Sequence, residues 1–216
     1  MNNQAPTGEI TGSNLISVIG SISLEDHDEM TNCTRLATTS ANLIATRFGQ
    51  PKEWFDEYMK TLHYLGWRAI DDSYTITTHH DVSGSIGDFL VASSDTGRDP
   101  QQANAMIDTL DSLQNNTAAT LYLDTETGLG KKFQVIPSRY DARGNLHIAV
   151  NSLELISEVR KGGFLFWNWQ QQSAKLVQKR AYLKLNRQVF ETMREQMESE
   201  LRKITMQRFA LRKSRS

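Results

Sequence analysis

The sequence has only one cysteine, Cys33, among its 216 residues, so an internal disulfide is excluded. It also has no apolar run near the roughly 18 residues that a spanning helix needs, and its longest informative run is Phe164-Leu165-Phe166-Trp167. The first six residues lack the basic start and apolar centre of a secretory signal. These features predict cytoplasmic synthesis with no signal peptide and no transmembrane helix, and they leave a non-classical export route open.

The sequence also lacks a recognisable catalytic motif. No Gly-x-Ser-x-Gly pattern occurs, and the stretch Thr127-Gly128-Leu129-Gly130-Lys131-Lys132 fails the phosphate-loop pattern. Thr125 stands where that pattern requires its first glycine, and Lys132 stands where a magnesium-binding Ser or Thr is required. We therefore predict a non-enzymatic protein that has no catalytic residues and no cofactor.

One short segment, His79-His80-Asp81, is the best candidate for metal or acid/base chemistry. On an extended strand His79 and Asp81 share one face while His80 points to the other, so at most two of the three can bind the same ion. A turn or loop histidine pair without chemistry is the favoured interpretation, and we predict no metal site. A metal-dependent enzyme built around these residues is kept as a third hypothesis.

The pattern of apolar residues predicts an α+β fold, with helices packed on a mainly antiparallel sheet. We expect one helix from Asp26 to Phe48, a second from Pro51 to Leu65 and a third that begins after Asp99 and stops at Asn115. The last two should cover one face of the sheet through apolar side chains, namely Trp54, Tyr58, Leu62, Met106, Ile107 and Leu110. Short β-rich runs predict strands at residues 74–78, 89–91, 121–123, 133–136 and 146–150.

Three regions are expected along the chain. Residues 1–23 are rich in Asn, Thr, Gly and Ser and predict a loosely held tail. Residues 24–162 form the α+β body, and residues 163–216 hold an aromatic segment followed by one long basic amphipathic helix from about Gln171 to about Arg212. The aromatic segment contributes an apolar patch of Phe164, Phe166, Trp167 and Trp169, which should be covered by the body or by a partner.

The net charge of −1 hides a strong separation of charge along the chain. Residues 175–216 hold 12 Lys/Arg and 4 Asp/Glu, net +8, and the remaining residues hold 12 Lys/Arg and 21 Asp/Glu, net −9. Every seventh position in this C-terminal region is apolar, which predicts an interface seam of Leu176, Leu183, Phe190, Met197, Ile204 and Leu211. Beside the seam runs a basic stripe of Arg180, Arg187, Arg194 and Arg208.

These patterns leave several interpretations open. The seam can simply pack on the protein's own body, because helices usually need such burial. Our functional prediction is a bacterial-type interaction protein, in which the long helix binds a protein partner or another copy of the chain. The alternative is a membrane-active, toxin-like protein whose helix binds an anionic membrane surface. Nucleic acid is disfavoured, because phosphate contacts would leave the apolar seam uncovered.

Overall fold

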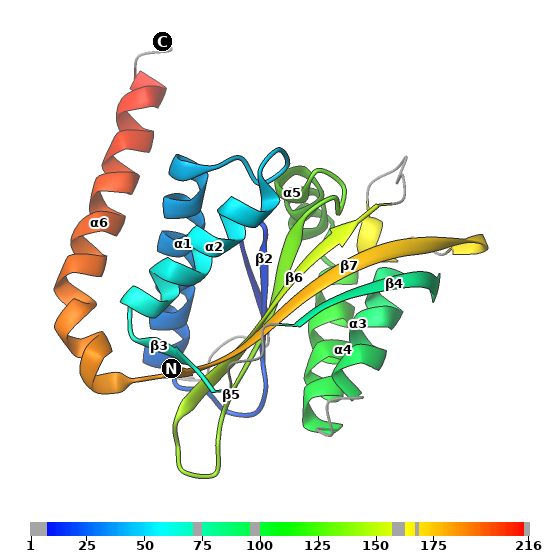
Figure 1. Ribbon diagram of the computed structural model, residues 1–216, viewed down its shortest axis with the longest axis horizontal. Coiled ribbons are helices and arrows are strands. Elements are labelled where there is room, and N and C mark those ends of the chain that lie inside the picture. The colour runs from blue at the N-terminus through cyan, green and yellow to red at the C-terminus, as the bar shows by residue number, and fades with distance from the viewer. Residues whose placement is uncertain (1–7, 71–74, 96–99, 157–162, 167–168, 214–216) are drawn as a thin grey trace. The chain divides into compact units, whose positions relative to one another are not determined.

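The computed structural model describes residues 8–70, 75–95, 100–156, 163–166 and 169–213 (Figure 1). The protein has the predicted α+β composition, and its strands form a seven-stranded mixed sheet. The chain separates into two compact units, each made of two stretches of sequence. Unit 1 comprises residues 1–27 and 69–184, and unit 2 comprises residues 28–68 and 185–216.

The sheet of unit 1 mixes parallel and antiparallel pairs. Its strands run in the order β1-β2-β5-β6-β7, and β4 also pairs with β7. Their bounds are β1 Gly8–Thr11, β2 Asn14–Val18, β4 Thr75–Gly84, β5 Phe133–Tyr140, β6 Leu146–Leu155 and β7 Trp169–Leu185. The β2–β5 pair is parallel, with Asn14 beside Gln134. The prediction of a mainly antiparallel sheet is therefore wrong, because an N-terminal strand enters beside a strand that lies more than a hundred residues later in the sequence.

The helices of unit 1 are α3 Ile86–Asp95, α4 Pro100–Gln114 and α5 Thr117–Thr127, with a short 3-10 turn, η1, at Phe164–Phe166. Local capping explains two of them. Ser85 Oγ accepts a hydrogen bond from the Asp88 amide while Asp88 accepts one from the Ser85 amide, which is a reciprocal cap at the start of α3. Asn116 accepts from the Ala119 amide at the start of α5, and Gly128 ends that helix in the left-handed conformation.

These helices bury their apolar faces in the main core of unit 1. The core joins α3, α4 and α5 to the central strands, and its members include Leu15, Ile86, Leu90, Met106, Leu110, Phe133, Leu153 and Phe164. Residues 89–91 and 121–123, which were predicted as strands, lie in α3 and α5. That prediction is wrong because the caps fix helical ends around short β-rich runs whose composition alone does not decide their conformation.

Unit 2 is built from three helices: α1 Leu24–Ile44, α2 Pro51–Tyr64 and α6 Arg187–Lys213. A short strand, β3 Trp67–Ala69, lies where the chain passes from unit 2 into unit 1. The predictions of helices over residues 26–48, 51–65 and 99–114 match α1, α2 and α4 to within a few residues. The second and third of these helices were also predicted to pack on one face of the sheet, but α2 belongs to unit 2 and α4 to unit 1. Trp54, Tyr58, Leu62, Met106 and Leu110 are buried as expected, whereas Ile107 is 40% exposed.

Two expectations about the chain ends are wrong. Residues 14–18, predicted as part of a loose tail, form β2 and are all buried. The C-terminal helix does not begin near Gln171, because residues 169–185 form β7 and the helix begins at Arg187. β7 pairs with both β4 and β6, and these long-range hydrogen bonds outweigh the helical spacing of its apolar residues.

Candidate interaction groove

The three helices of unit 2 pack around large side chains of α2. Pro51 opens this helix, and its apolar residues Trp54, Phe55, Tyr58 and Leu62 are buried. The rings of Trp54 and Tyr58 stack with their centroids 5.3 Å apart, and Trp54 Nε1 donates a hydrogen bond of 2.7 Å to Asn42 of α1. The wide apolar face of α2 is therefore the centre of this unit.

A glycine fixes the place where α6 begins. Gly66 has a φ of +96°, and a Cβ atom on it would lie 3.0 Å from the backbone nitrogen of Phe190. The Asn186 amide donates to the Gly66 carbonyl at 2.9 Å, and the Phe190 amide donates to the Asn186 carbonyl at 3.0 Å. Only glycine combines this conformation with such a close approach, so Gly66 brings the first turn of α6 against the end of α2.

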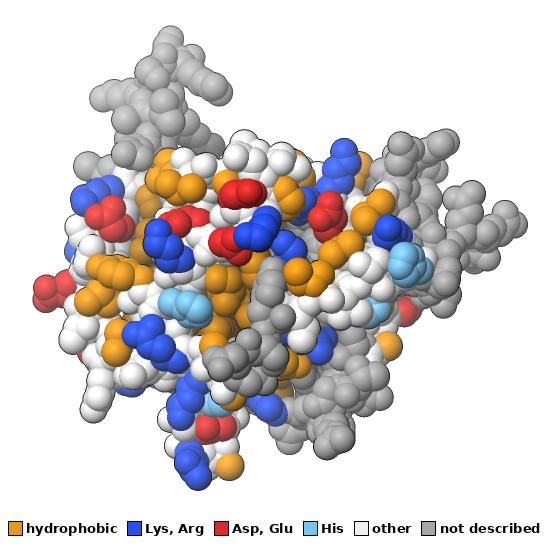
Figure 2. Space-filling view, viewed as in Figure 1, with side chains coloured by type: hydrophobic (Ala, Val, Ile, Leu, Met, Phe, Trp, Pro, Cys, Tyr) orange, Lys and Arg blue, Asp and Glu red, His pale blue; other side chains and the backbone are white. Residues whose placement is uncertain are grey.

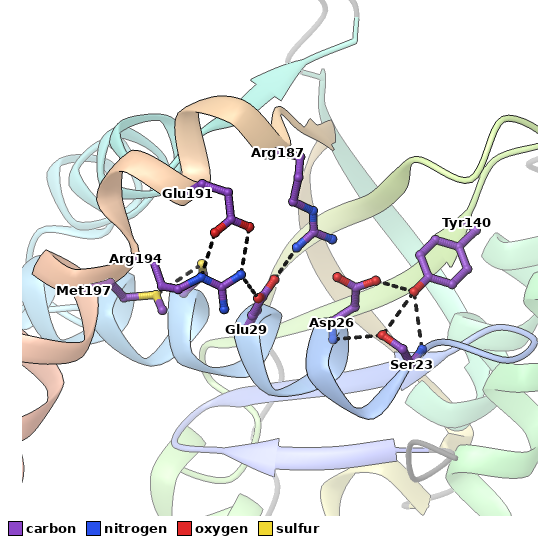
Figure 3. A network of polar contacts seen from close by, with 9 residues as sticks. Ser23, Asp26, Glu29, Tyr140, Arg187, Glu191, Arg194 and Met197 are labelled. Atoms are coloured by element: carbon purple, nitrogen blue, oxygen red, sulfur yellow. Dashed lines mark hydrogen bonds and ion pairs between the residues drawn. The ribbon is translucent and has the colours of Figure 1, made fainter. Parts of the chain in front are cut away.

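A buried carboxylate joins α6 to α1 (Figure 3). Glu29 of α1 is buried and forms ion pairs with Arg187 and, at 2.5 Å, with Arg194. Arg194 is held in turn by Glu191, at 2.8 Å. Burial raises the pKa of Glu29, although both guanidinium groups oppose this shift. The two arginines therefore neutralise a charge that would be costly to bury alone.

The next turns of α6 stay closely packed. Met197 is buried, with its Sδ atom 3.7 Å from the Sγ atom of Cys33, and Leu201 is also buried. Cys33 is a buried free cysteine. Burial raises the pKa of its thiol to about 12, which argues against a reactive role for Cys33.

Near Leu201 the three helices leave between them a groove of about 720 Å³, which we call the unit 2 groove. Its apolar lining includes Leu36 and Leu43 from α1, Tyr64 from α2 and Ile204 from α6. Its other lining residues are Thr39, Ser40, Asn42, Glu57, Lys60, Thr61, Glu200 and Lys203. The Tyr64 hydroxyl donates to Gln196 Oε1 at 2.8 Å and ties α2 to α6 beside the groove.

The charges that line the groove are balanced. Lys60 pairs with Glu57 at 3.1 Å, and Lys203 pairs with Glu200 at 2.7 Å. Figure 2 shows hydrophobic side chains interspersed with charged side chains of both signs over α2 and α6. An apolar lining with paired charges suits an amphipathic ligand better than an ion of either sign.

The end of α1 carries further exposed apolar residues. Leu43 is 81% exposed, Ile44 is 66% exposed and Phe48, in the α1–α2 connection, is 51% exposed. The guanidinium group of Arg47 lies 5.1 Å from the centre of the Phe48 ring. Only Leu43 of these three apolar residues lines the groove.

The structure divides the predicted seam between two elements. Leu176 and Leu183 are buried on β7, while Phe190 and Met197 are buried on α6. Ile204 lines the groove, and Leu211 lies in α6 but its side chain is outside the described residues. One continuous helical seam is therefore ruled out, because a strand occupies its first part and four of its members are already covered.

The predicted basic stripe is divided in the same way. Arg180 lies on β7 and donates to Asn151 Oδ1 at 2.8 Å, whereas Arg187 and Arg194 bind Glu29. Arg208 lies in the last turns of α6, and its side chain is not described. The aromatic patch is also dispersed: Phe164 is buried against Phe133, with ring centroids 4.9 Å apart, and Phe166 is half-buried. Trp167 and the side chain of Trp169 lie outside the described residues.

The histidine segment lies on β4. His79 contacts Gln178 through a hydrogen bond of 3.3 Å and packs edge-on against Phe89, and His80 is exposed. The side chain of Asp81 is outside the described part of the chain. Within that part, no three His, Cys, Asp or Glu side chains gather as a metal site would require. No described helix has the length and apolarity to cross a bilayer.

Sequence reasoning missed most of the groove. Leu36 and Leu43 lie seven residues apart on α1, which places them on one side of that helix next to its buried stripe. This second apolar row was the available signal, whereas the contributions of Tyr64 and Lys60 depend on how α2 packs.

A comparison of the sequence with protein-family models and with curated proteins finds no match.

Proposed function

We propose that this protein is a non-enzymatic interaction protein, and that the unit 2 groove binds an amphipathic helix of a protein partner. The observation that carries the proposal is the groove itself, with its apolar lining and balanced charges between three helices. Helices in a groove of this kind are recognised by apolar residues on one face. A fourth helix laid there would complete a four-helix arrangement and cover Leu36, Leu43 and Ile204.

The groove has room for side chains of a bound helix. Its volume of about 720 Å³ equals that of pockets that enclose a small molecule, which span about 300–1,000 Å³. Lys60, which pairs with Glu57, and Lys203, which pairs with Glu200, would contact polar residues at the edges of the bound helix. Such contacts give specificity more than affinity. Leu43, which is 81% exposed in the free protein, would become buried on binding and would contribute hydrophobic free energy.

The test compares two neighbouring residues. Leu43→Glu places a charge in the groove, whereas Ile44→Glu makes the same change at an exposed residue that does not line the groove. The probe is a phage-displayed library of amphipathic helical peptides selected on the wild-type protein. We expect the selected peptides to bind Ile44→Glu like wild type and Leu43→Glu at least about tenfold more weakly, since burying an unpaired charge costs more than 1.4 kcal/mol. Failure to enrich any helix, or equal binding by both variants, contradicts the proposal.

A second candidate function rests on a different observation. Ile44 and Phe48 are exposed apolar residues outside the groove, and residues 201–216 hold six Lys/Arg and no Asp/Glu. Exposed apolar side chains together with basic residues favour binding to an anionic lipid surface. The proposal is that Ile44, Phe48 and the basic residues of α6 contact such a membrane without crossing it.

Sedimentation with lipid vesicles tests the second candidate. The protein is expected to pellet with vesicles of phosphatidylcholine and phosphatidylglycerol, but not with phosphatidylcholine alone, and added salt should weaken the binding. The double variant Ile44→Glu/Phe48→Glu should stay in the supernatant, although its groove remains intact. Binding that is independent of lipid charge or of these two residues rules out this surface.

A further inference from the structure

We infer that the helix bound in the unit 2 groove is α6 of a second copy of this chain, in an antiparallel pair, so that the protein self-associates. This inference rests on the proposed function and names the partner. Two observations support it: the order of acidic and basic residues along α6, and the position of the α6 residues that line the groove.

The charge of α6 changes sign near its middle. Residues 187–200 hold four Asp/Glu and two Lys/Arg, and residues 201–213 hold five Lys/Arg and no Asp/Glu. Two such helices in antiparallel orientation place the acidic half of each beside the basic half of the other. A parallel pair would instead place like charges together. Antiparallel pairing also sets the two helix dipoles in opposite directions, which is favourable.

The groove lies where the charge changes sign. Glu200, Lys203 and Ile204 are its lining residues from α6, and the helix continues from there to Lys213. In Figure 1 the last turns of α6 extend beyond the ends of α1 and α2 within unit 2. In an antiparallel pair this end lies beside the acidic first half of α6 of the second copy.

A two-fold axis gives one particular register. When the pair is centred at the level of Leu201 and Arg202, Glu200 of each copy lies at the height of Lys203 of the other. Both side chains are exposed, and each faces the groove. At the same register Glu195 lies level with Arg208, and Glu191 lies level with Arg212. The same contact then occurs twice, as an interface between two identical surfaces requires.

Charge reversal with sedimentation velocity tests this interface. The wild-type protein should form a dimer at up to ~100 µM, the range in which weak specific contacts are populated. Glu200→Lys and Lys203→Glu should each raise the dimer dissociation constant at least about tenfold, because every reversal creates two repulsive contacts. The double reversal Glu200→Lys/Lys203→Glu should restore the wild-type value to within about threefold.

Glu198→Lys is the matched control. Glu198 pairs with Arg202 within α6 and does not line the groove, so its reversal perturbs the helix to a similar degree without changing the proposed contact. Its dissociation constant should stay near that of wild type. Equal effects of Glu198→Lys and Glu200→Lys, or no recovery in the double reversal, would overturn the register. Circular dichroism of each variant shows that the fold is retained.

The result also separates this inference from the proposed function. A wild-type protein that stays monomeric at ~100 µM overturns self-association. If selected helical peptides still bind the groove in a Leu43-dependent manner, the groove serves a different protein. If they do not bind either, both proposals fail.

Discussion

At the scale of single residues, Asp141 organises the turn between β5 and β6. Its carboxylate accepts hydrogen bonds of 2.8 Å from the Arg143 and Asn145 amides, and it contacts His147 at 3.1 Å. The hydrogen bonds from Asn145 hold the pKa of Asp141 well below its ordinary value. Burial lowers the pKa of His147, and the neighbouring carboxylate opposes that shift. The ionised form of Asp141 therefore stabilises the hairpin.

A dependence of stability on pH follows from Asp141. A carboxylate whose pKa is lowered on folding stabilises the fold when the pH is above the pKa of aspartate in the unfolded chain, about 3.9. This stabilisation is lost as the pH falls through the pKa of the folded state. We expect Asp141→Asn to lower the melting temperature by a few degrees at pH 7. Between about pH 4 and pH 2 the melting temperature of this variant should fall less steeply than that of the wild type. Asp108→Asn, an exposed change on α4, should leave both properties unaltered. If the plots of melting temperature against pH are parallel for the wild type and Asp141→Asn, another group causes the loss of stability at low pH.

At the scale of elements, the sequence predicts well those helices that carry their own start and stop signals. Pro51 and Gly66 bracket α2, and Pro100 and the asparagines at 115 and 116 bracket α4. The signals act within a few residues, so they do not depend on the rest of the fold. The hairpin of β5 and β6 was predictable for the same reason, from the turn residues between two β-rich runs.

Local sequence signals do not predict where β7 ends and α6 begins. Leu176, Leu183 and Phe190 follow one another at seven-residue spacing, which a helix explains, yet the first two lie on a strand. β7 contains few β-branched residues, so its conformation depends on pairing with β4 and β6. The stop at Asn186 depends on Gly66, more than a hundred residues earlier in the sequence. The start of α6 thus results from a tertiary contact.

The candidate site shows the same limit. The spacing of Arg187 and Arg194 correctly placed them on one side of the helix, but periodicity does not reveal that their partner is the buried Glu29. The groove is lined by residues of α1, α2 and α6 together, so its volume is a property of three packed helices. Sequence alone therefore predicted an interaction through the C-terminal region, and our proposal assigns that interaction to the unit 2 groove.

At the scale of the whole molecule, unit 2 is built from two distant parts of the chain. α1 and α2 lie in the first third of the sequence, while α6 is the last element. Unit 1 has a hydrophobic core of its own, and none of the described residues in that core belongs to α2 or α6. This division predicts that the loss of α6 has its main effect on unit 2.

Deletion of residues 187–216 tests the division. It removes the buried side chains of Phe190, Met197 and Leu201, and it leaves the carboxylate of Glu29 without its two arginines. Large cavities and unpaired buried charges each cost about 3–5 kcal/mol, which is comparable to the whole stability of a small three-helix unit. We expect hydrogen exchange measured by mass spectrometry to show lost protection in residues 28–64 and retained protection in β5 and β6.

The control is a shorter deletion, of residues 205–216, which keeps Phe190, Met197, Leu201 and both arginines that bind Glu29. Protection in residues 28–64 should then remain as in wild type, because every described contact of α6 with α1 and α2 is retained. If the shorter deletion already unprotects this region, the last turns of α6 stabilise unit 2 directly. If the longer deletion leaves residues 28–64 protected, α1 and α2 form a stable pair without α6, and the division into units must be drawn differently.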